Sequence, residues 1–516
     1  IVRLVNGSSS GQIPSFYDAM LRAKWKPADG QLLEGGVLLA GDGLSMRNPE
    51  GDALRNDFIE VDSSRDSQSA RSDGSFDTSR DQLALHNRMR VGSLYWRALM
   101  GSNAILETRF GYAPQRLRFS LHGENNASLD IETQLASLRS DLTWHARGHR
   151  LQLGFEAYRT RTTGLVSAYA SFLNLRRTNS ALNLSDQPER YLIDVASTRT
   201  YGAFYLQDDW PVWGGRLELT RGLRYEHDGL TGEHLVSPRL GFRTGAGGGW
   251  SLRGTWGVYN TLRNTPMEVQ PRRDGTPLQA ERVIETTLGV SRATARGWKA
   301  GVTGYHKSFS NLVYESEPAY YSNGAQARSH GVETWLEWAP SGSALSTRLQ
   351  YAWSKTQQRD AKAWRRRLYE DPVSGEEVWG AVFEQPYWYS PLQDQRHHFA
   401  VDARLELRSW EFGARFELAS GLPYTPVESV VEDSEGQAFG IVGRKGSARL
   451  PLYRRLDLRV TRSFQGGSLA WRVYAEVLNA TAAQNVYMYR SSRDYSQRYS
   501  VAMLPFLPTL GVEASF

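Results

Sequence analysis

The sequence predicts an all-β fold, a transmembrane up-and-down antiparallel β-barrel, and three observations carry this prediction. Apolar and polar residues alternate along short segments from one end of the chain to the other. Very short turns and long polar connections follow each other in a strict order. The chain also holds 16 Trp and 25 Tyr, yet it has no apolar run as long as the ~20 residues of a membrane-spanning helix.

The alternation has a period of two residues, which places successive side chains on opposite faces of a strand. In residues 399–407, apolar residues alternate with Asp402, Arg404 and Glu406, and residues 17–25 repeat the pattern. The charged face would meet water in a soluble sandwich, but in a membrane barrel it lines a wet lumen while the apolar face meets lipid. Alternation alone leaves both folds open.

The connections decide between these folds. Tight turns are predicted at residues 26–30, 101–103, 146–149, 212–215, 245–249, 293–297, 341–343, 408–409 and 465–467. Polar connections, most of them longer, are predicted near residues 46–84, 122–127, 166–196, 228–235, 262–280, 314–327, 357–395, 422–450 and 481–506. Those at 122–127 and 228–235 are short but keep their place in the order. Such short–long alternation is typical of a membrane barrel with short periplasmic turns and long extracellular loops.

This order of turns gives about nineteen strands, the last of which ends on the periplasmic side. The chain would then begin on the extracellular side, with residues 1–14 as the tail of an extracellular loop. Because single-chain bacterial barrels have even strand numbers, we expect about three strands before Ile1 and about 22 strands in the whole barrel. The alternative is that one strand is missed or merged with a neighbour.

Composition excludes several classes of protein. The chain has no Cys, which rules out a disulfide framework and a thiolate metal site. The net charge of +6 is mild, and no basic stripe carries interleaved aromatics, so no nucleic-acid partner is expected. Residues 1–7 lack the charged and apolar regions of a signal peptide, so this is either a mature chain or one without its N-terminal part.

Several segments resemble, in order, the barrel of TonB-dependent outer-membrane receptors. Residues 201–210, YGAFYLQDDW, resemble the family strand that ends in Gln-Asp-Glu/Asp-Trp, and residues 237–242, SPRLGF, are similar to its Ser-Pro-Arg-Leu-Gly strand. Further similar segments follow at residues 285–289, 305, 311–312, 330–333, 394–397, 456–460 and 475–480. The last strand ends in Phe516, which resembles the signal that the outer-membrane assembly machinery reads.

The resemblance covers nearly all of residues 1–516, which we take as one barrel domain. It implies a place in the outer membrane of a Gram-negative bacterium and active uptake of a scarce nutrient such as a siderophore, cobalamin, a glycan or a peptide. It also implies energy from TonB. The family's plug and TonB-contacting segment are not recognisable in the sequence, so we expect TonB to act through an unseen segment before Ile1.

Exposed aromatic and arginine residues in the long loops are the candidates for ligand recognition. They are Arg272, Arg273, Trp364, Arg365, Arg366, Tyr369, Trp379, Tyr387, Trp388 and Tyr389. For those in the loop at 356–395, an equal alternative is that they pack in an aromatic belt or between loops and contact lipopolysaccharide phosphates. Arg272 and Arg273, in another loop, are weaker candidates. Whether a surface lipoprotein caps the barrel stays open.

Two rival functions remain, a passive channel or porin and a barrel-anchored adhesin or enzyme. The sequence shows no common catalytic or phosphate-binding motif, so no enzyme activity and no cofactor are expected. His397 and His398 are strand neighbours that point to opposite faces, which favours a role in opening a strand over metal binding. Carboxylates in residues 62–81 could bind Ca²⁺, but the arginines between them favour a solvated loop.

Overall fold

The computed structural model describes residues 15–47, 81–121, 127–169, 190–262, 277–317, 320–370, 377–432, 438–492 and 495–515. Every regular element in these ranges is a strand, and 19 strands form one antiparallel sheet. This confirms the predicted all-β fold and the count of about nineteen strands; the total of about 22 stays a prediction. Among the described residues, no helix has the length and apolar character needed to cross a membrane.

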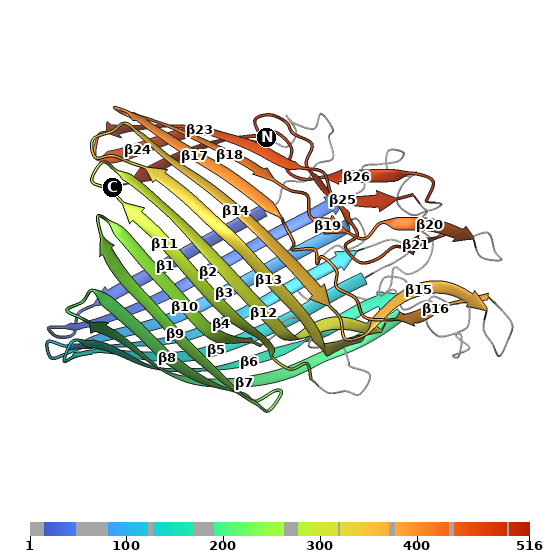
Figure 1. Cartoon of the computed structure of the whole chain (residues 1–516), viewed down its shortest axis with the longest axis horizontal. Coiled ribbons are helices and arrows are strands. Elements are labelled where there is room, and N and C mark those ends of the chain that lie inside the picture. The colour runs from blue at the N-terminus through green and yellow to red at the C-terminus, as the bar shows by residue number, and fades with distance from the viewer. Residues whose placement is uncertain are drawn as a thin grey trace.

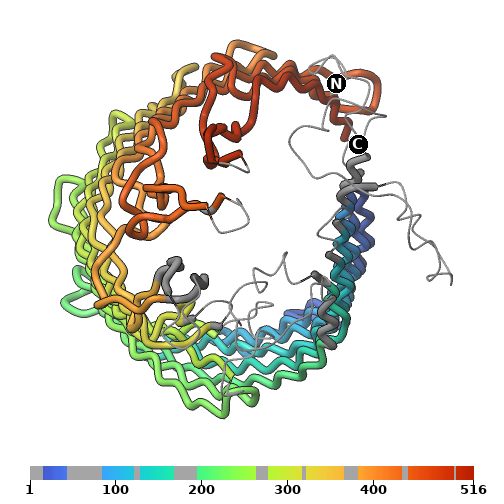
Figure 2. The backbone as a smooth tube through the Cα atoms, turned by 90° about the vertical axis from the view of Figure 1, so that its right-hand side faces the viewer, coloured from blue at the N-terminus to red at the C-terminus, as the bar shows by residue number. Residues whose placement is uncertain are grey.

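The strands of the large sheet pair in chain order. They are β1 (Ser15–Trp25), β2 (Gln31–Arg47), β3 (Asp81–Met100), β4 (Ala104–Leu121), β5 (Ala127–Ala146), β6 (His149–Tyr169), β7 (Arg190–Val212), β8 (Leu217–Asp228), β9 (Glu233–Gly247), β10 (Trp250–Thr261), β11 (Glu281–Ala293), β12 (Trp298–Glu317), β13 (Tyr320–Trp338), β14 (Leu345–Arg359), β17 (His397–Leu407), β18 (Trp410–Ala419), β23 (Tyr453–Gly466), β24 (Leu469–Leu478) and β27 (Leu507–Ser515). Figure 2 shows this sheet bent round a wide interior.

The sheet has two different ends, seen at the left and right of Figure 1. All nine predicted tight turns join strands at one end, which we call the turn end, and β27 also finishes there. The long connections lie at the opposite end, the loop end. The long connection expected at residues 314–327 is wrong, because β12 continues to Glu317 and β13 resumes at Tyr320. The bulge at Asn311, whose φ is +58°, lets the ladder continue past a break in register.

The long connections contain strands of their own, which the sequence reading did not foresee. They pair as β15 (Ala363–Glu370) with β16 (Glu377–Glu384), β19 (Pro423–Tyr424) with β22 (Ala448–Arg449), β20 (Val427–Glu432) with β21 (Ala438–Val442), and β25 (Val486–Ser491) with β26 (Arg498–Ala502). In Figure 1 the pairs β15–β16, β20–β21 and β25–β26 extend past the large sheet at the loop end. Figure 2 shows β20–β21 and β25–β26 inside the ring.

The two faces of the sheet differ as the alternation predicts. One face carries exposed Leu, Phe and Trp, such as Phe204, which is 59% exposed, and the other carries acidic and basic residues. His398 on the charged face lines a cavity of about 250 Å³ together with Leu450 and Met503, which belong to the loops that fold inward. The charged face is therefore the inner face. Leaving the apolar outer face in water would forgo ~25 cal/mol per Å² of burial, so it fits a lipid environment.

Candidate ligand-binding site at the loop end

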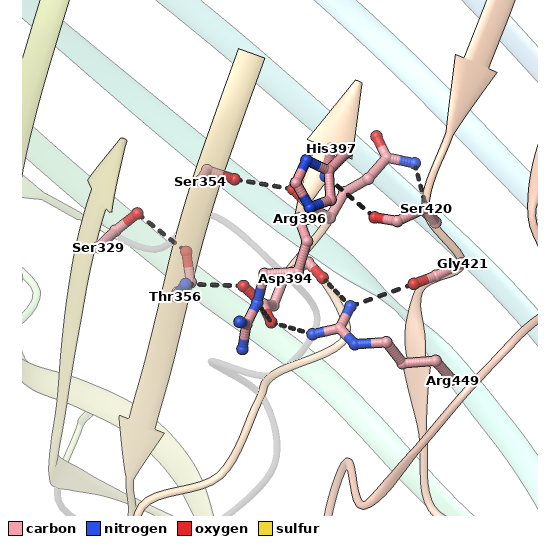
Figure 3. A network of polar contacts seen from close by, with 10 residues as sticks. Ser329, Ser354, Thr356, Asp394, Arg396, His397, Ser420, Gly421 and Arg449 are labelled. Atoms are coloured by element: carbon pink, nitrogen blue, oxygen red, sulfur yellow. Dashed lines mark hydrogen bonds and ion pairs between the residues drawn. The ribbon is translucent and has the colours of Figure 1, made fainter. Parts of the chain in front are cut away.

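A buried aspartate joins two of the long connections (Figure 3). Asp394 lies between β16 and β17 and is fully buried. One carboxylate oxygen accepts the Thr356 amide at 2.7 Å, and the other accepts Nε of Arg396 at 2.8 Å and Nη2 of Arg449. Arg449 in β22 also donates Nη1 to the carbonyls of Asp394 at 2.7 Å and Gly421 at 3.1 Å. The connection that precedes β17 is thereby fixed to the one that follows β18.

The charge of Asp394 is stabilised by these contacts. Burial alone would raise the pKa of the Asp394 carboxyl, but the Thr356 amide and the guanidinium groups of Arg396 and Arg449 together lower it below the ordinary value of 3.8. The carboxylate therefore stays ionised in a site that excludes water, where charge-assisted hydrogen bonds are strong.

A second buried aspartate, Asp360, lies just after β14 and joins the same two connections. Its Oδ1 accepts the Tyr389 hydroxyl at 2.9 Å and the Gln358 amide at 3.0 Å, and its Oδ2 accepts Lys445 Nζ at 2.7 Å. Burial and the nearby Asp360 charge raise the pKa of the Tyr389 hydroxyl. The phenol therefore keeps its proton and donates a hydrogen bond to the carboxylate.

The turn at residues 443–447 fits closely against the segment before β17. The Lys445 amide donates to the Tyr387 hydroxyl at 3.1 Å, and the Gly446 amide donates to Thr425 Oγ1 at 3.2 Å. Gly446 has a φ of +62°, and a Cβ there would lie 1.9 Å from the Ser390 carbonyl oxygen. Only glycine meets both demands, because it tolerates a left-handed backbone and has no side chain.

Cationic side chains at this end stack on tyrosine rings. The Arg444 guanidinium carbon lies 5.3 Å from the Tyr387 ring centre, and Lys445 Nζ lies 5.5 Å from that of Tyr389. Arg498 lies 4.2 Å from the ring centre of Tyr489. Arg498 Nη1 also donates to the Tyr424 hydroxyl at 3.4 Å. We define the mouth cluster as Tyr387, Tyr389, Tyr424, Arg444, Lys445, Tyr489 and Arg498.

The mouth cluster combines cations with and without an acidic partner. The Lys445 charge is compensated by Asp360. Arg444 and Arg498 are exposed, and among the described residues no ion pair is recorded for either one. A guanidinium that lies on an aromatic face keeps its N–H edge available, and this edge matches a carboxylate or a similar anion. The arrangement can bind an electron-rich, anionic ligand.

Three of the predicted aromatic residues, Tyr387, Trp388 and Tyr389, do not all face the same way. Tyr387 and Tyr389 take part in the mouth cluster, but Trp388 lies between them and stacks under Arg328, whose guanidinium carbon is 4.5 Å from its ring centre. Arg328 shares the outer face with Val332, which is 38% exposed. Trp388 therefore belongs to the outer surface.

The other predicted ligand-binding residues do not belong to the mouth cluster. Trp364 donates its indole N–H to the Glu315 carbonyl at 3.1 Å, which fixes β15 against β12. The backbones of the remaining residues in this connection lie in the β15–β16 pair, where Arg365 faces Val382 and Tyr369 faces Val378 in register. Arg366, in β15, and Trp379, in β16, belong to the same pair of strands. Arg272, Arg273 and Phe516 lie outside the described residues.

Sequence reasoning missed the basic half of the mouth cluster. Arg444 and Lys445 stand between Gly443 and Gly446, a pattern that indicates a tight basic turn but carries no specific function. Arg498 gives no local signal, because its tyrosine partners lie in two other segments of the chain. These residues meet only when the loops fold over the interior.

The structure also places the two adjacent histidines. His397 Nδ1 lies 2.9 Å from the hydroxyl of Tyr351 on the outer face, and His398 Nε2 lies 3.4 Å from Glu417 on the inner face. They point apart, as strand geometry predicts. In the described ranges no set of three or more His, Asp or Glu side chains is arranged to hold a metal. The acidic segment at 62–80 lies outside the described residues.

Comparison with known proteins adds a family to this geometry. Three solved structures share the fold at low identity. The ferric citrate transporter FecA has 14% identity and a TM-score of 0.62, with 97% of this chain and 70% of that chain covered. The copper transporter OprC has 11% identity and a TM-score of 0.63, with 97% and 72% covered. The ferric yersiniabactin uptake receptor FyuA from Yersinia pestis has 14% identity and a TM-score of 0.63, with 98% and 71% covered.

No curated protein sequence matches the chain. The family model for the TonB dependent receptor-like β-barrel matches residues 12–480, which is most of the chain. This range contains all nine tight turns and most of the mouth cluster. The chain therefore belongs to the family of TonB-dependent receptor-like β-barrels.

Proposed function

We propose that this chain is the barrel of an outer-membrane importer that captures a small anionic metal chelate at its mouth cluster. The observation that carries the proposal is the pair Arg444 and Arg498, two exposed guanidinium groups that stack on tyrosines and have no recorded acidic partner in the described part of the chain. On this proposal the loop end faces the outside of the cell and the turn end faces the periplasm.

The rigid frame below the mouth cluster supports this role. Asp360 and Asp394 fix the tyrosine-bearing segment and the 443–447 turn to each other before any ligand arrives. A site whose cations are held in place loses little side-chain entropy on binding, so more of the interaction energy remains as affinity. Family membership and a fold shared with transporters of ferric chelates favour uptake over a passive pore.

Energy coupling is the second part of the proposal. In a barrel of this family, TonB would act on a plug segment that contacts the inner wall, and the bound ligand would then be released inward. That wall carries acidic and basic groups in equal number around a groove of about 420 Å³. They are Glu337, Arg348, Asp402, Arg404, Arg415, Asp457, Arg459 and Glu476. Such a wall suits a polar, water-containing contact that can be broken and remade. No covalent chemistry is assigned to this chain.

Ligand binding tests the first part. The purified chain in neutral detergent is titrated with ferric citrate as the anionic probe and with cyanocobalamin as a probe without net charge, and tryptophan fluorescence is recorded. We expect ferric citrate to bind, and the Arg444→Gln/Arg498→Gln variant to bind it at least about tenfold more weakly, because hydrogen bonds to charged groups are worth roughly 1.5–3 kcal/mol each.

The control is Arg462→Gln. Arg462 is an outward residue at the turn end that stacks on Trp410 at 5.2 Å, so its loss should leave chelate affinity unchanged. Equal loss in the control, or preferential binding of cyanocobalamin, would remove the anionic-ligand assignment. Transport is tested separately in cells that produce the chain with whatever segment precedes it. Uptake of the labelled chelate that persists without TonB would show a passive channel instead.

A further inference from the structure

Six outward-facing arginines lie on β3, β4 and β6, towards the loop end. We define the arginine patch as Arg88, Arg90, Arg116, Arg118, Arg159 and Arg161. The pairing of these strands runs without a net shift in register, so the alternation can be followed along each strand. Each arginine belongs to the alternate set that carries the exposed apolar side chains further down the same strand. These side chains are Leu94 in β3, Phe110 in β4 and Leu153 in β6.

The patch places like charges against each other. Arg88 lies directly opposite Arg116 in the ladder between β3 and β4, an arrangement that destabilises a sheet unless an anion compensates it. Two carboxylates of β5, Asp130 and Glu132, lie opposite the two β4 arginines in the ladder. Asp130 accepts Nε and Nη2 of Arg116 at 2.8 and 2.7 Å and Nε of Arg118 at 3.2 Å.

The remaining four arginines lack such compensation. Glu132, the next acidic residue on the outer face of β5, accepts the Gln134 amide at 2.8 Å. In the described ranges no ion pair is recorded for Arg88, Arg90, Arg159 or Arg161, and all four are exposed. The patch therefore retains a net positive charge on the outside of the barrel.

Outward arginines at the turn end behave differently. Arg292 and Arg462 each lie 5.2 Å from a tryptophan ring centre, that of Trp250 and that of Trp410. Their guanidinium groups thus make contacts within the protein, whereas Arg88, Arg90, Arg159 and Arg161 are exposed without a recorded ion pair in the described ranges. The contrast shows that outward arginines on this sheet are not all alike.

The position of the patch along the strands indicates which layer of the membrane it contacts. The last outward aromatic of β4 is Tyr112, which pairs with Gly92, and Arg90 lies two residues further along β3. At roughly 3.4 Å per residue, the patch begins within about 7 Å of the apolar band, measured along the strand. The layer directly outside the hydrocarbon core holds the polar headgroups, and arginine forms paired hydrogen bonds with phosphate.

We propose that the arginine patch is a binding site for the phosphate groups of lipopolysaccharide in the outer leaflet. The patch lies at the loop end, which faces that leaflet, and its four uncompensated cations span β3 to β6, a width suited to a headgroup that carries more than one phosphate. The site is separate from the mouth cluster, which opens to the interior. It rests on the membrane orientation proposed above and not on the identity of the transported ligand.

The test measures lipopolysaccharide binding to the purified chain in neutral detergent by native mass spectrometry. The variant carries Arg88→Gln, Arg90→Gln, Arg159→Gln and Arg161→Gln together, and the matched control carries Arg292→Gln and Arg462→Gln. We expect the patch variant to bind lipopolysaccharide at least about tenfold more weakly, and the control to bind it like the wild type. Retention of heat-modifiable mobility on gels shows that both variants still form the barrel.

Two further arms identify the lipid. Dephosphorylated lipopolysaccharide should bind the wild type as weakly as the intact lipid binds the patch variant. Competition with phosphatidylglycerol or with inorganic phosphate should fail to displace the intact lipid at equal phosphate concentration. The proposal is overturned if the patch variant binds as tightly as the wild type, if phosphate removal has no effect, or if either competitor displaces the lipid equally well.

Discussion

At the scale of single residues, two buried carboxylates, those of Asp394 and Asp360, hold the long connections together. Asp394 accepts hydrogen bonds from β14, from its own segment and from β22, and Asp360 accepts from Tyr389 and Lys445. Each binds groups from two long connections. Removing a cationic partner leaves a buried carboxylate with fewer hydrogen bonds, which costs more than the hydrogen bond itself contributes.

Asp394→Asn should loosen the loops without affecting the barrel. The amide keeps the size of the side chain but removes the charge that balances Arg396 and Arg449, so we expect local stability to fall by about 1–3 kcal/mol. Hydrogen exchange at Leu450, whose amide donates to the Leu422 carbonyl, would then accelerate, and ferric citrate affinity would drop. Asp402→Asn on the inner wall serves as the control. Unchanged exchange in the Asp394 variant would show that Arg449 is held by its carbonyl contacts alone.

Acid should release the same contact, and the sign follows from the lowered pKa of Asp394. A carboxyl whose folded pKa lies below its ordinary 3.8 stabilises the fold above that value, and this stability is lost as the pH falls through the folded pKa. A fluorophore on Ser447→Cys, at the end of the 443–447 turn, should report no change from neutral pH to about pH 4 and a transition below it. In the Asp394→Asn background, the acid transition should be absent.

At the scale of elements, the turn at residues 443–447 depends on a single glycine. Gly446→Ala would force a side chain into a left-handed backbone and place its Cβ against the Ser390 carbonyl oxygen. We expect the turn to move away from Tyr387, which removes Arg444 from its ring and weakens ferric citrate binding by about tenfold or more. Gly342→Ala, also at positive φ but in open space at the turn end, is the control. Equal losses in both variants would point to general strain.

The elements differ in how well the sequence predicts them. Strands of the large sheet and their tight turns follow from local rules, because alternation and turn residues act over a few positions. The loop hairpins escape those rules. In β15, the run Trp364 to Arg367 has no alternation, and β19 pairs with β22 across more than twenty residues of chain. In β22, Arg449 also binds Asp394 of another connection, a contact that no short window of sequence reveals.

At the scale of the whole molecule, the sheet positions the candidate site but does not determine it. The tyrosines at 387 and 389 were within reach of sequence reasoning, since aromatics in a long loop indicate recognition. Their basic partners come from two other connections, so the mouth cluster exists only once the loops lie over the interior (Figure 2). Trp388 is an exposed aromatic in the same connection as these tyrosines, but it faces the outer surface and does not belong to the mouth cluster.

The orientation of the whole barrel can be tested with two single cysteines, because the chain has no Cys and the wild type gives no background. Ser429→Cys lies in β20 at the loop end, and Ser341→Cys lies in the turn between β13 and β14, and both positions are exposed. A maleimide reagent that does not cross membranes should label Ser429→Cys in intact cells. Ser341→Cys should be labelled only after the outer membrane is opened, because the turn end faces the periplasm. The reverse pattern would invert the barrel and place both the mouth cluster and the arginine patch on the wrong side of the membrane.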